Sequence, residues 1–156
     1  MAETMTFNGR ILHLLDQRAL PGEVRYVACG TAAETAAAIR SLVVRGAPAI
    51  GVAAAFGVAL SGQRALESGA PLAPAIEAAQ SVLAASRPTA VNLFWALEQM
   101  RGIWAAHADA SREVAVAALL AGASKIHDDD IASCLAMGEF GAALFPSRAR
   151  VLTHCN

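Results

Sequence analysis

The stretch Ser41–Leu60, SLVVRGAPAIGVAAAFGVAL, contains one charged residue, Arg45, in apolar surroundings. Gly46 can adopt the left-handed conformation that ends a helix, and Pro48 suits the first turn of a new helix. The stretch therefore predicts a helix, a tight break and a long buried helix. Free backbone N–H groups beside a permanent cation favour binding of phosphate or another anion. The alternative is a packed helix junction in which the arginine caps a neighbouring carbonyl.

A second arginine occupies a similar position further along the chain, in SRPTAVNLFW, residues 86–95. Pro88 disfavours helix at Arg87, and Thr89 is a candidate N-cap for a helix to about His107. Two arginines at helix junctions can bind one phosphate, each through a bidentate contact. The alternative for Arg87 is a surface residue in a loop. Four apolar residues of the following helix are expected in the core: Phe94, Trp95, Leu97 and Trp104.

The composition predicts a single domain rich in helix. The 156 residues are 56% hydrophobic and 5% aromatic, with a net charge of −1. This charge gives no support to nucleic acid or an acidic membrane surface as partner. The uncharged run 46–62 is too short to span a membrane, and the chain start lacks the apolar core of a signal peptide. We therefore expect a soluble, cytoplasmic protein whose excess of apolar residues indicates a partner surface.

Three cysteines, Cys29, Cys134 and Cys155, are far apart and form no C-x-x-C pair, so reduced thiols are expected. The apolar runs 11–16 and 23–29 predict an antiparallel hairpin. His13 in the first run is expected to be an ordinary strand residue.

Helices account for most of the remaining chain. Thr31-Ala32-Ala33-Glu34 has the form of a capping box. The expected helices span about 32–44, 48–67, 73–85, 89–107 and 111–126, and a last one starts at about Asp130 and ends before Pro146.

The sequence His127-Asp128-Asp129-Asp130 resembles a metal cluster, but acidic residues also collect at helix N-termini, and a cap is the favoured interpretation. The helix that follows is expected to direct Cys134 and Met137 towards a core. Gly138 and Gly141 suggest a close helix contact.

Residues 150–156, RVLTHCN, predict an apolar strand that ends in a polar tip. Reactive groups in α/β sheets lie at the carboxyl ends of strands, where His154 and Cys155 fall. The fold expected overall is mainly α: an N-terminal β-hairpin and a helical bundle, ending at the first strand of a truncated Rossmann-like α/β domain.

Three motifs together resemble one family: VVRGAPAIG at 43–51, RPTAVNLFWAL at 87–97 and LTHCN at 152–156. They are similar to the methylthioribose-1-phosphate isomerases of methionine salvage, which share a fold with the α, β and δ subunits of translation initiation factor 2B. The segment LLDQ at 14–17 and the region from Asp128 to Ala142 also resemble the family pattern.

The resemblance implies a two-domain homodimer with the active site between the domains. Residues 1–30 would be the N-terminal β element, 31–146 the helical domain and 147–156 the start of the truncated α/β domain. By motif match, the substrate-binding residues would be Arg45, Gly46, Ala47 and Arg87. Cys155 would be catalytic, opposite an aspartate in a later domain. The substrate implied is a small sugar phosphate, and no metal or nicotinamide cofactor is implied.

The reaction implied is conversion of 5-methylthioribose 1-phosphate to 5-methylthioribulose 1-phosphate. One alternative is a related isomerase acting on 5-deoxyribose 1-phosphate or ribose 1,5-bisphosphate. Another is a non-catalytic regulatory or scaffold protein like the initiation factor 2B subunits. For the 156 residues alone, an inactive helical fragment that associates through an exposed domain interface is expected.

Overall fold

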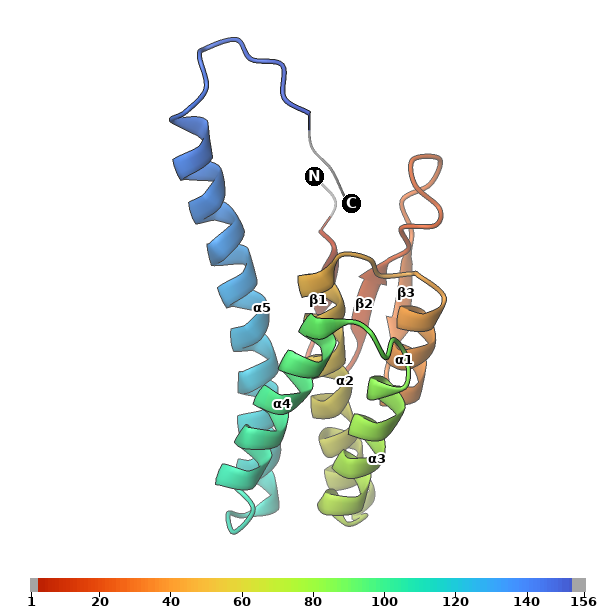
Figure 1. Ribbon diagram of the computed structural model, residues 1–156. Helices are drawn as coiled ribbons and strands as arrows, with labels where there is room; N and C mark the ends of the chain where they lie inside the picture. The colour runs from red at the N-terminus through yellow and green to blue at the C-terminus, as the bar shows by residue number, and fades with distance from the viewer. Residues whose placement is uncertain (1–2, 153–156) are drawn as a thin grey trace.

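The computed structural model describes residues 3–152 and consists of a small antiparallel sheet and five helices (Figure 1). The strands are β1 (Met5–Phe7), β2 (Leu12–Leu15) and β3 (Tyr26–Cys29), paired in that order. The helices are α1 (Ala32–Arg40), α2 (Ala47–Ser68), α3 (Leu72–Ala84), α4 (Val91–Ala106) and α5 (Arg112–Ala142). The mainly helical fold and the β2–β3 hairpin predicted from the sequence are confirmed.

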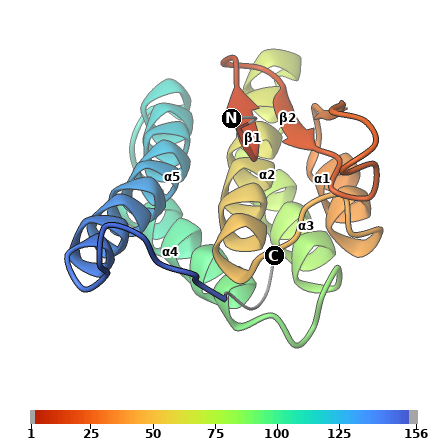
Figure 2. The same ribbon diagram turned by 90° about the horizontal axis from the view of Figure 1, so that it is seen from above.

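Helix α2 is the centre of the bundle, and α1, α3, α4 and α5 all pack against it (Figures 1 and 2). Its apolar residues occur all round the helix, and almost every side chain from Ile50 to Leu60 is buried. By length and composition alone, the helix could cross a membrane. However, 72% of its most apolar 18-residue stretch is buried within the protein. This burial marks α2 as the core helix of the bundle.

A glycine stands at each end of α2, and an arginine binds the carbonyls at its C-terminal end. Gly46 is the N-cap with φ +89°, and Gly69 ends the helix in the left-handed conformation. The Arg112 guanidinium donates to the carbonyl oxygens of Ala65 and Ala70 at 3.0 and 2.6 Å. These carbonyls lie at and just beyond the last turn, where intrahelical donors are missing.

The predicted capping box at the start of α1 is confirmed in part, because Glu34 accepts from the N–H of Gly30 and not from that of the N-cap Thr31. The Thr31 hydroxyl accepts from the Glu34 N–H at 3.1 Å, and the Glu34 carboxylate accepts from the Gly30 N–H at 2.7 Å. The predicted end of this helix at residue 44 was wrong, because α1 ends at Arg40. Leu42 has φ +60°, and this turn buries Val43 and Val44 in the core. Gly46 therefore does not end α1, and although its φ is positive, its ψ of 128° lies outside the left-handed helical conformation that was expected.

Three other elements differ from what the sequence analysis expected. Strand β1 was not predicted, although Asn8-Gly9 is a strong hairpin signal and Gly9 has φ +93°. Ala90 rather than Thr89 is the N-cap of α4, because residues 87–90 form a turn in which the Ala90 N–H donates to the Arg87 carbonyl at 3.1 Å. The third concerns α5.

Helix α5 runs without a break through the acidic segment that was expected to cap a new helix. Lys125 and Asp129, one turn apart, form an ion pair of 2.7 Å that stabilises the continuous helix. Beyond residue 130 the helix extends past the bundle, and its side chains are exposed (Figure 1). Cys134 and Met137 are therefore exposed rather than directed to a core. Among the residues described, a Cβ added at Gly138 or Gly141 would meet no other part of the fold within 4 Å, so the expected close helix contact is absent there.

Candidate functional site

The first part of the candidate site is the junction between α1 and α2. Arg45 immediately precedes the Gly46 N-cap, and α2 begins at Ala47 without a side-chain cap. The N–H groups of the first turn lack intrahelical acceptors, and Pro48 has none to satisfy. The start of α2 thus presents free donors and the positive end of the helix dipole.

Arg45 is partly buried, and its Nε is buried without a hydrogen-bond partner. Within residues 3–152 its guanidinium makes no hydrogen bond or ion pair. A buried donor without an acceptor costs about 1–3 kcal/mol, so an incoming anion would relieve that cost. The alternative interpretation, in which Arg45 caps a neighbouring carbonyl, was wrong for the residues that the structure describes.

The second part is the turn that joins α3 to α4. Arg87 lies there and is partly buried; it follows the buried Ser86 and precedes the exposed Pro88. Its guanidinium forms no hydrogen bond or ion pair with any described side chain or carbonyl. Like Arg45, it is a cation at the start of a helix whose N-cap makes no side-chain hydrogen bond.

Close backbone packing brings these two helix starts together. A Cβ added at Gly51, in the second turn of α2, would lie 2.7 Å from the carbonyl oxygen of Asn92, in the first turn of α4. Only a glycine allows this approach. The two arginine-bearing junctions therefore lie at the same end of one helix pair, as the view along the bundle shows (Figure 2).

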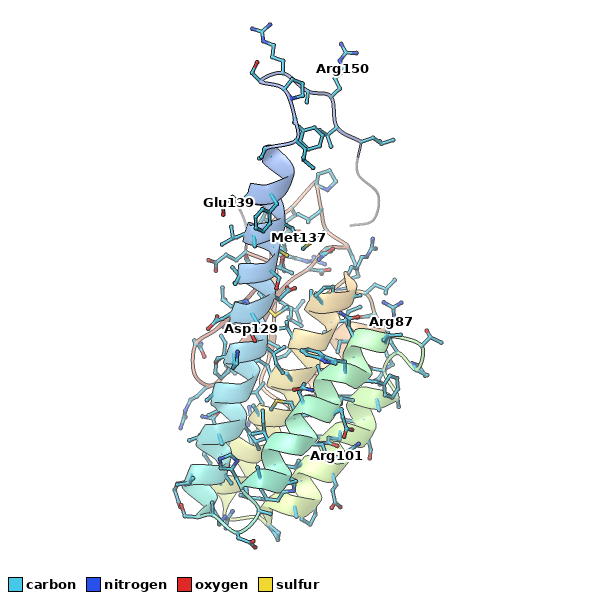
Figure 3. All side chains as sticks on the ribbon, turned by 60° about the vertical axis from the view of Figure 1, so that its left-hand side comes forward. Arg87, Arg101, Asp129, Met137, Glu139 and Arg150 are labelled. Atoms are coloured by element: carbon cyan, nitrogen blue, oxygen red, sulfur yellow. The ribbon has the colours of Figure 1, made fainter. Side chains whose placement is uncertain are left out.

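A groove of about 520 Å³, which we call the interhelical groove, opens between α5 and the first turns of α2 and α4. Its walls come from three helices: Pro48, Gly51, Val52, Val91, Asn92, Trp95, Ile126, Asp129, Asp130 and Ser133. Figure 3 shows Arg87 beside the start of α4 and Asp129 on α5 at about the same height along the bundle.

The expectation that Trp95 and Phe94 belong to the core was wrong. Trp95 is 52% exposed and lines the interhelical groove, and Phe94 is 44% exposed on another face of α4. Leu97 is buried and Trp104 packs against the core, as predicted. The spacing of four residues between Val91 and Trp95 places them on the same face of α4. The sequence does not indicate whether another element packs on that face.

The acidic side of the groove was also not foreseen. Asp129 is paired with Lys125, whereas Asp130 is partly buried and forms no ion pair with the described residues. In the part of the chain from residue 3 to 152, no three His, Cys, Asp or Glu side chains assemble as metal ligands.

The predicted catalytic residue, Cys155, lies outside the described residues, as does His154. The segment after α5 arches back towards the end of the bundle where α2 and α4 begin (Figures 1 and 2). Residues 150–152 form no strand, so the described part of the predicted terminal strand was wrong. Cys29 is fully buried, and burial, with a smaller contribution from Glu34, raises the pKa of its thiol to about 11. Cys29 is thus unsuited to proton transfer near neutral pH.

The structure is thus a helical bundle in which, among residues 3–152, each of two neighbouring helix starts carries an arginine without a partner. Residues 43–156 match the model of the initiation factor 2 subunit family, and the chain belongs to this family. The match includes both arginine junctions and α5.

Relatives with curated names support a particular branch of the family. A methylthioribose-1-phosphate isomerase of Methylococcus capsulatus is 56% identical over 147 residues, which are 93% of this chain and 40% of the relative. That of Albidiferax ferrireducens is 50% identical over 155 residues, 99% of this chain and 44% of the relative. The chain thus spans about two-fifths of the length of the relatives it matches.

Two solved structures share the fold. The 5-methylthioribose 1-phosphate isomerase of Pyrococcus horikoshii OT3 superposes with a TM-score of 0.88 at 35% identity, covering 94% of this chain and 41% of that one. The translation initiation factor eIF-2B subunit delta of A. fulgidus gives 0.82 at 32% identity, covering 93% and 42%.

Proposed function

We propose that this chain is the phosphate-binding portion of a methylthioribose-1-phosphate isomerase of methionine salvage. The observation that carries the proposal is the pair of unpaired arginines at adjacent helix starts, one of them with a buried Nε that lacks an acceptor. The names of relatives at 50% and 56% identity agree with it. The complete protein would convert 5-methylthioribose 1-phosphate to 5-methylthioribulose 1-phosphate.

The binding roles follow from the chemistry of the two junctions. Arg45 and Arg87 would each donate to oxygens of the C1 phosphate, and guanidinium groups suit such bidentate contacts. The small residues Gly46 and Ala47 would let the α2 backbone N–H groups approach the same phosphate. Held by permanent cations, the phosphate would stay attached to C1 throughout the reaction.

The isomerisation needs proton transfer as well as binding. The ring oxygen gains a proton when the ring opens, the C2 hydroxyl loses one, and a hydrogen passes from C2 to C1. Cys155 would take part in these transfers together with an aspartate from the remainder of the protein. Nearby arginines would lower the pKa of its thiol towards a useful range.

We also propose a division of the whole protein. Residues 1–30 form the β element, 31–146 the helical domain, and 147–156 the start of an α/β domain that continues in the complete protein. That domain would cover the exposed apolar end of α5 and complete the active site. The complete protein would be a cytoplasmic homodimer.

Substitutions in the full-length protein test the proposed roles. Arg87→Ala should raise KM for 5-methylthioribose 1-phosphate by about 10- to 100-fold, because hydrogen bonds to a charged group are lost. Cys155→Ser should abolish turnover while calorimetry still detects substrate binding. Arg10→Ala is the matched arginine control, because Arg10 is exposed and paired with Glu67. Unchanged KM in Arg87→Ala, or full turnover in Cys155→Ser, contradicts the corresponding role.

A second candidate function is supported by the superposition on an eIF-2B delta subunit. Under this alternative the chain would belong to a non-catalytic regulatory or scaffold protein. A direct assay of the full-length protein with 5-methylthioribose 1-phosphate separates the two candidates, since a scaffold protein gives no turnover.

A further inference from the structure

We propose that Asp16 is a positioning residue for Arg45. Asp16 immediately follows β2 and lies outside the interhelical groove, yet hydrogen bonds connect it to the segment that carries Arg45. This inference rests on the proposed function, because it takes Arg45 to bind the C1 phosphate. It makes phosphate binding depend on the loop between β2 and β3 as well as on the helix starts.

The loop that follows β2 is held mainly by polar contacts to one carboxylate. Its two large apolar side chains, Leu20 and Val24, are 40% and 60% exposed, so burial of apolar surface contributes little to fixing it. The buried carboxylate of Asp16 accepts instead from the Arg18 backbone N–H and from the guanidinium groups of Arg18 and Arg25. Such charge-assisted hydrogen bonds are stronger than neutral ones. They hold both ends of the loop, because Arg18 lies near its start and Arg25 at its end.

One backbone hydrogen bond connects this loop to the segment before Arg45. The Gln17 N–H, next to Asp16 in the chain, donates to the Val43 carbonyl at 3.0 Å. The Val43 N–H in turn donates to the Ala38 carbonyl of α1 at 2.9 Å. Val43 is thus held on both sides, by the loop through its carbonyl and by α1 through its N–H. Arg45 follows two residues later, so the position of its backbone depends on this anchored residue.

The conformation of Leu42 shows why the segment needs an anchor. Leu42 has φ +60°, in the left-handed region that is unfavourable for a residue with a Cβ. Such a conformation persists only where the surrounding structure holds it. The hydrogen bonds at Val43 and the burial of Val43 and Val44 provide that support. Without the hydrogen bond from Gln17 the turn would relax, and the guanidinium of Arg45 would move from the phosphate position.

A double-mutant cycle in the full-length protein tests this role, with 5-methylthioribose 1-phosphate as substrate. Asp16→Asn removes the charge that holds the loop and should lower kcat/KM by about tenfold, because a misplaced binding group loses much of its effect. In an Arg45→Ala background, the same change should lower kcat/KM by less than about twofold, since no guanidinium remains to be positioned. A residue that only stabilises the fold would give the same fall in both backgrounds.

Arg25→Met provides a second variant that weakens the cluster less. Arg25 is 51% exposed, and its loss leaves Arg18 paired with the carboxylate. The fall in kcat/KM should be smaller than in Asp16→Asn, and it should again disappear in the Arg45→Ala background. The cycle with Arg25→Met decides the question if Asp16→Asn does not fold.

Ile76→Val is the matched control for stability. Ile76 is buried in α3 next to Ala75, whose carbonyl accepts from the Ser61 hydroxyl in the second half of α2. The change removes one buried methyl group far from the start of α2, so it lowers stability but should leave kcat/KM at the wild-type value.

Three results would overturn the positioning role and leave the proposed function intact. They are equal falls in kcat/KM in both backgrounds, no fall in either cluster variant, and a fall in the control as large as in Asp16→Asn. Absence of turnover by the wild-type protein overturns the proposed function, and the positioning role of Asp16 with it.

Discussion

Asp16 is fully buried, and its carboxylate is held by two arginines. Arg18 donates through Nε to one oxygen at 2.7 Å and through a terminal nitrogen to the other at 2.8 Å. Arg25 donates to the second oxygen at 2.8 and 3.0 Å. The hydrogen bond from Arg18 is the main reason that the pKa of Asp16 lies far below its usual range. Burial opposes this shift, and Arg25 reinforces it.

This arrangement predicts how stability changes with pH. A carboxylate whose pKa is lowered by folding stabilises the protein above its unfolded pKa of about 4, and that stabilisation is lost as the pH falls further. Asp16→Asn should lower the free energy of unfolding by about 1–2 kcal/mol at pH 7, because the buried carboxylate loses its charge while Arg18 and Arg25, 41% and 51% exposed, stay partly hydrated. Denaturant unfolding should show the difference shrinking below about pH 4. A difference that stays constant down to pH 2 contradicts the assignment.

Among single residues, the sequence identified Arg45 and Arg87 because each stands beside a helix breaker. Their shared location could not be derived from sequence alone, since it depends on the contact between Gly51 and Asn92. Trp95 and Asp130 were missed as groove residues for a related reason. The sequence around an apolar or acidic residue in a helix is the same whether another element packs on its face of the helix or that face is open to solvent.

At the scale of elements, the crossing of α2 and α4 depends on Gly51. Gly51→Ala would force a Cβ to within 2.7 Å of the Asn92 carbonyl, and backbone cannot yield as a flexible side chain does. We expect a loss of about 1–3 kcal/mol in the free energy of unfolding, as in other overpacked cores. Thermal unfolding of the chain measures this loss.

Gly102→Ala provides the matched control. Gly102 lies within α4, and nothing lies within 4 Å of a Cβ added there. This substitution should leave stability unchanged or raise it by up to about 1 kcal/mol, because alanine favours helix over glycine. Equal effects of the two substitutions would contradict the close approach of α2 and α4.

Elements with strong local signals were predicted well. The capping box before α1, the apolar length of α2 and the β2–β3 hairpin depend on residues close in the chain. The end of α1 was wrong because burial of Val43 and Val44 overrode the helical pattern. The break expected in α5 was also wrong, because the acidic residues lie within the helix, where the exposed ion pair between Lys125 and Asp129 adds a small stabilisation.

At the scale of the molecule, the end of α5 and the segment after it expose many large apolar side chains. They are Leu135, Met137, Phe140, Leu144 and Leu152, exposed by 66–98%. A surface of this kind is rare on an isolated domain and promotes association. The apolar excess in the composition predicted such a surface but could not locate it.

The 156-residue chain should therefore associate as its concentration rises. The double substitution Leu135→Ser and Phe140→Ser should shift sedimentation velocity profiles towards the monomer without lowering the unfolding temperature, because both side chains are exposed. Val24→Ser is the control, since Val24 is 60% exposed on the loop between β2 and β3. Profiles that the double substitution does not change would show that another surface drives association.

The unbroken course of α5 has a geometric consequence for whatever the chain joins. Its 31 residues form a single rod about 46 Å long, anchored in the bundle over its first half. One residue inserted between Ile131 and Ala142 would rotate the following segment by about 100°, whereas seven would restore its bearing to within about 20°. The number of residues in this rod, as well as their identity, therefore determines the direction in which the chain leaves the bundle.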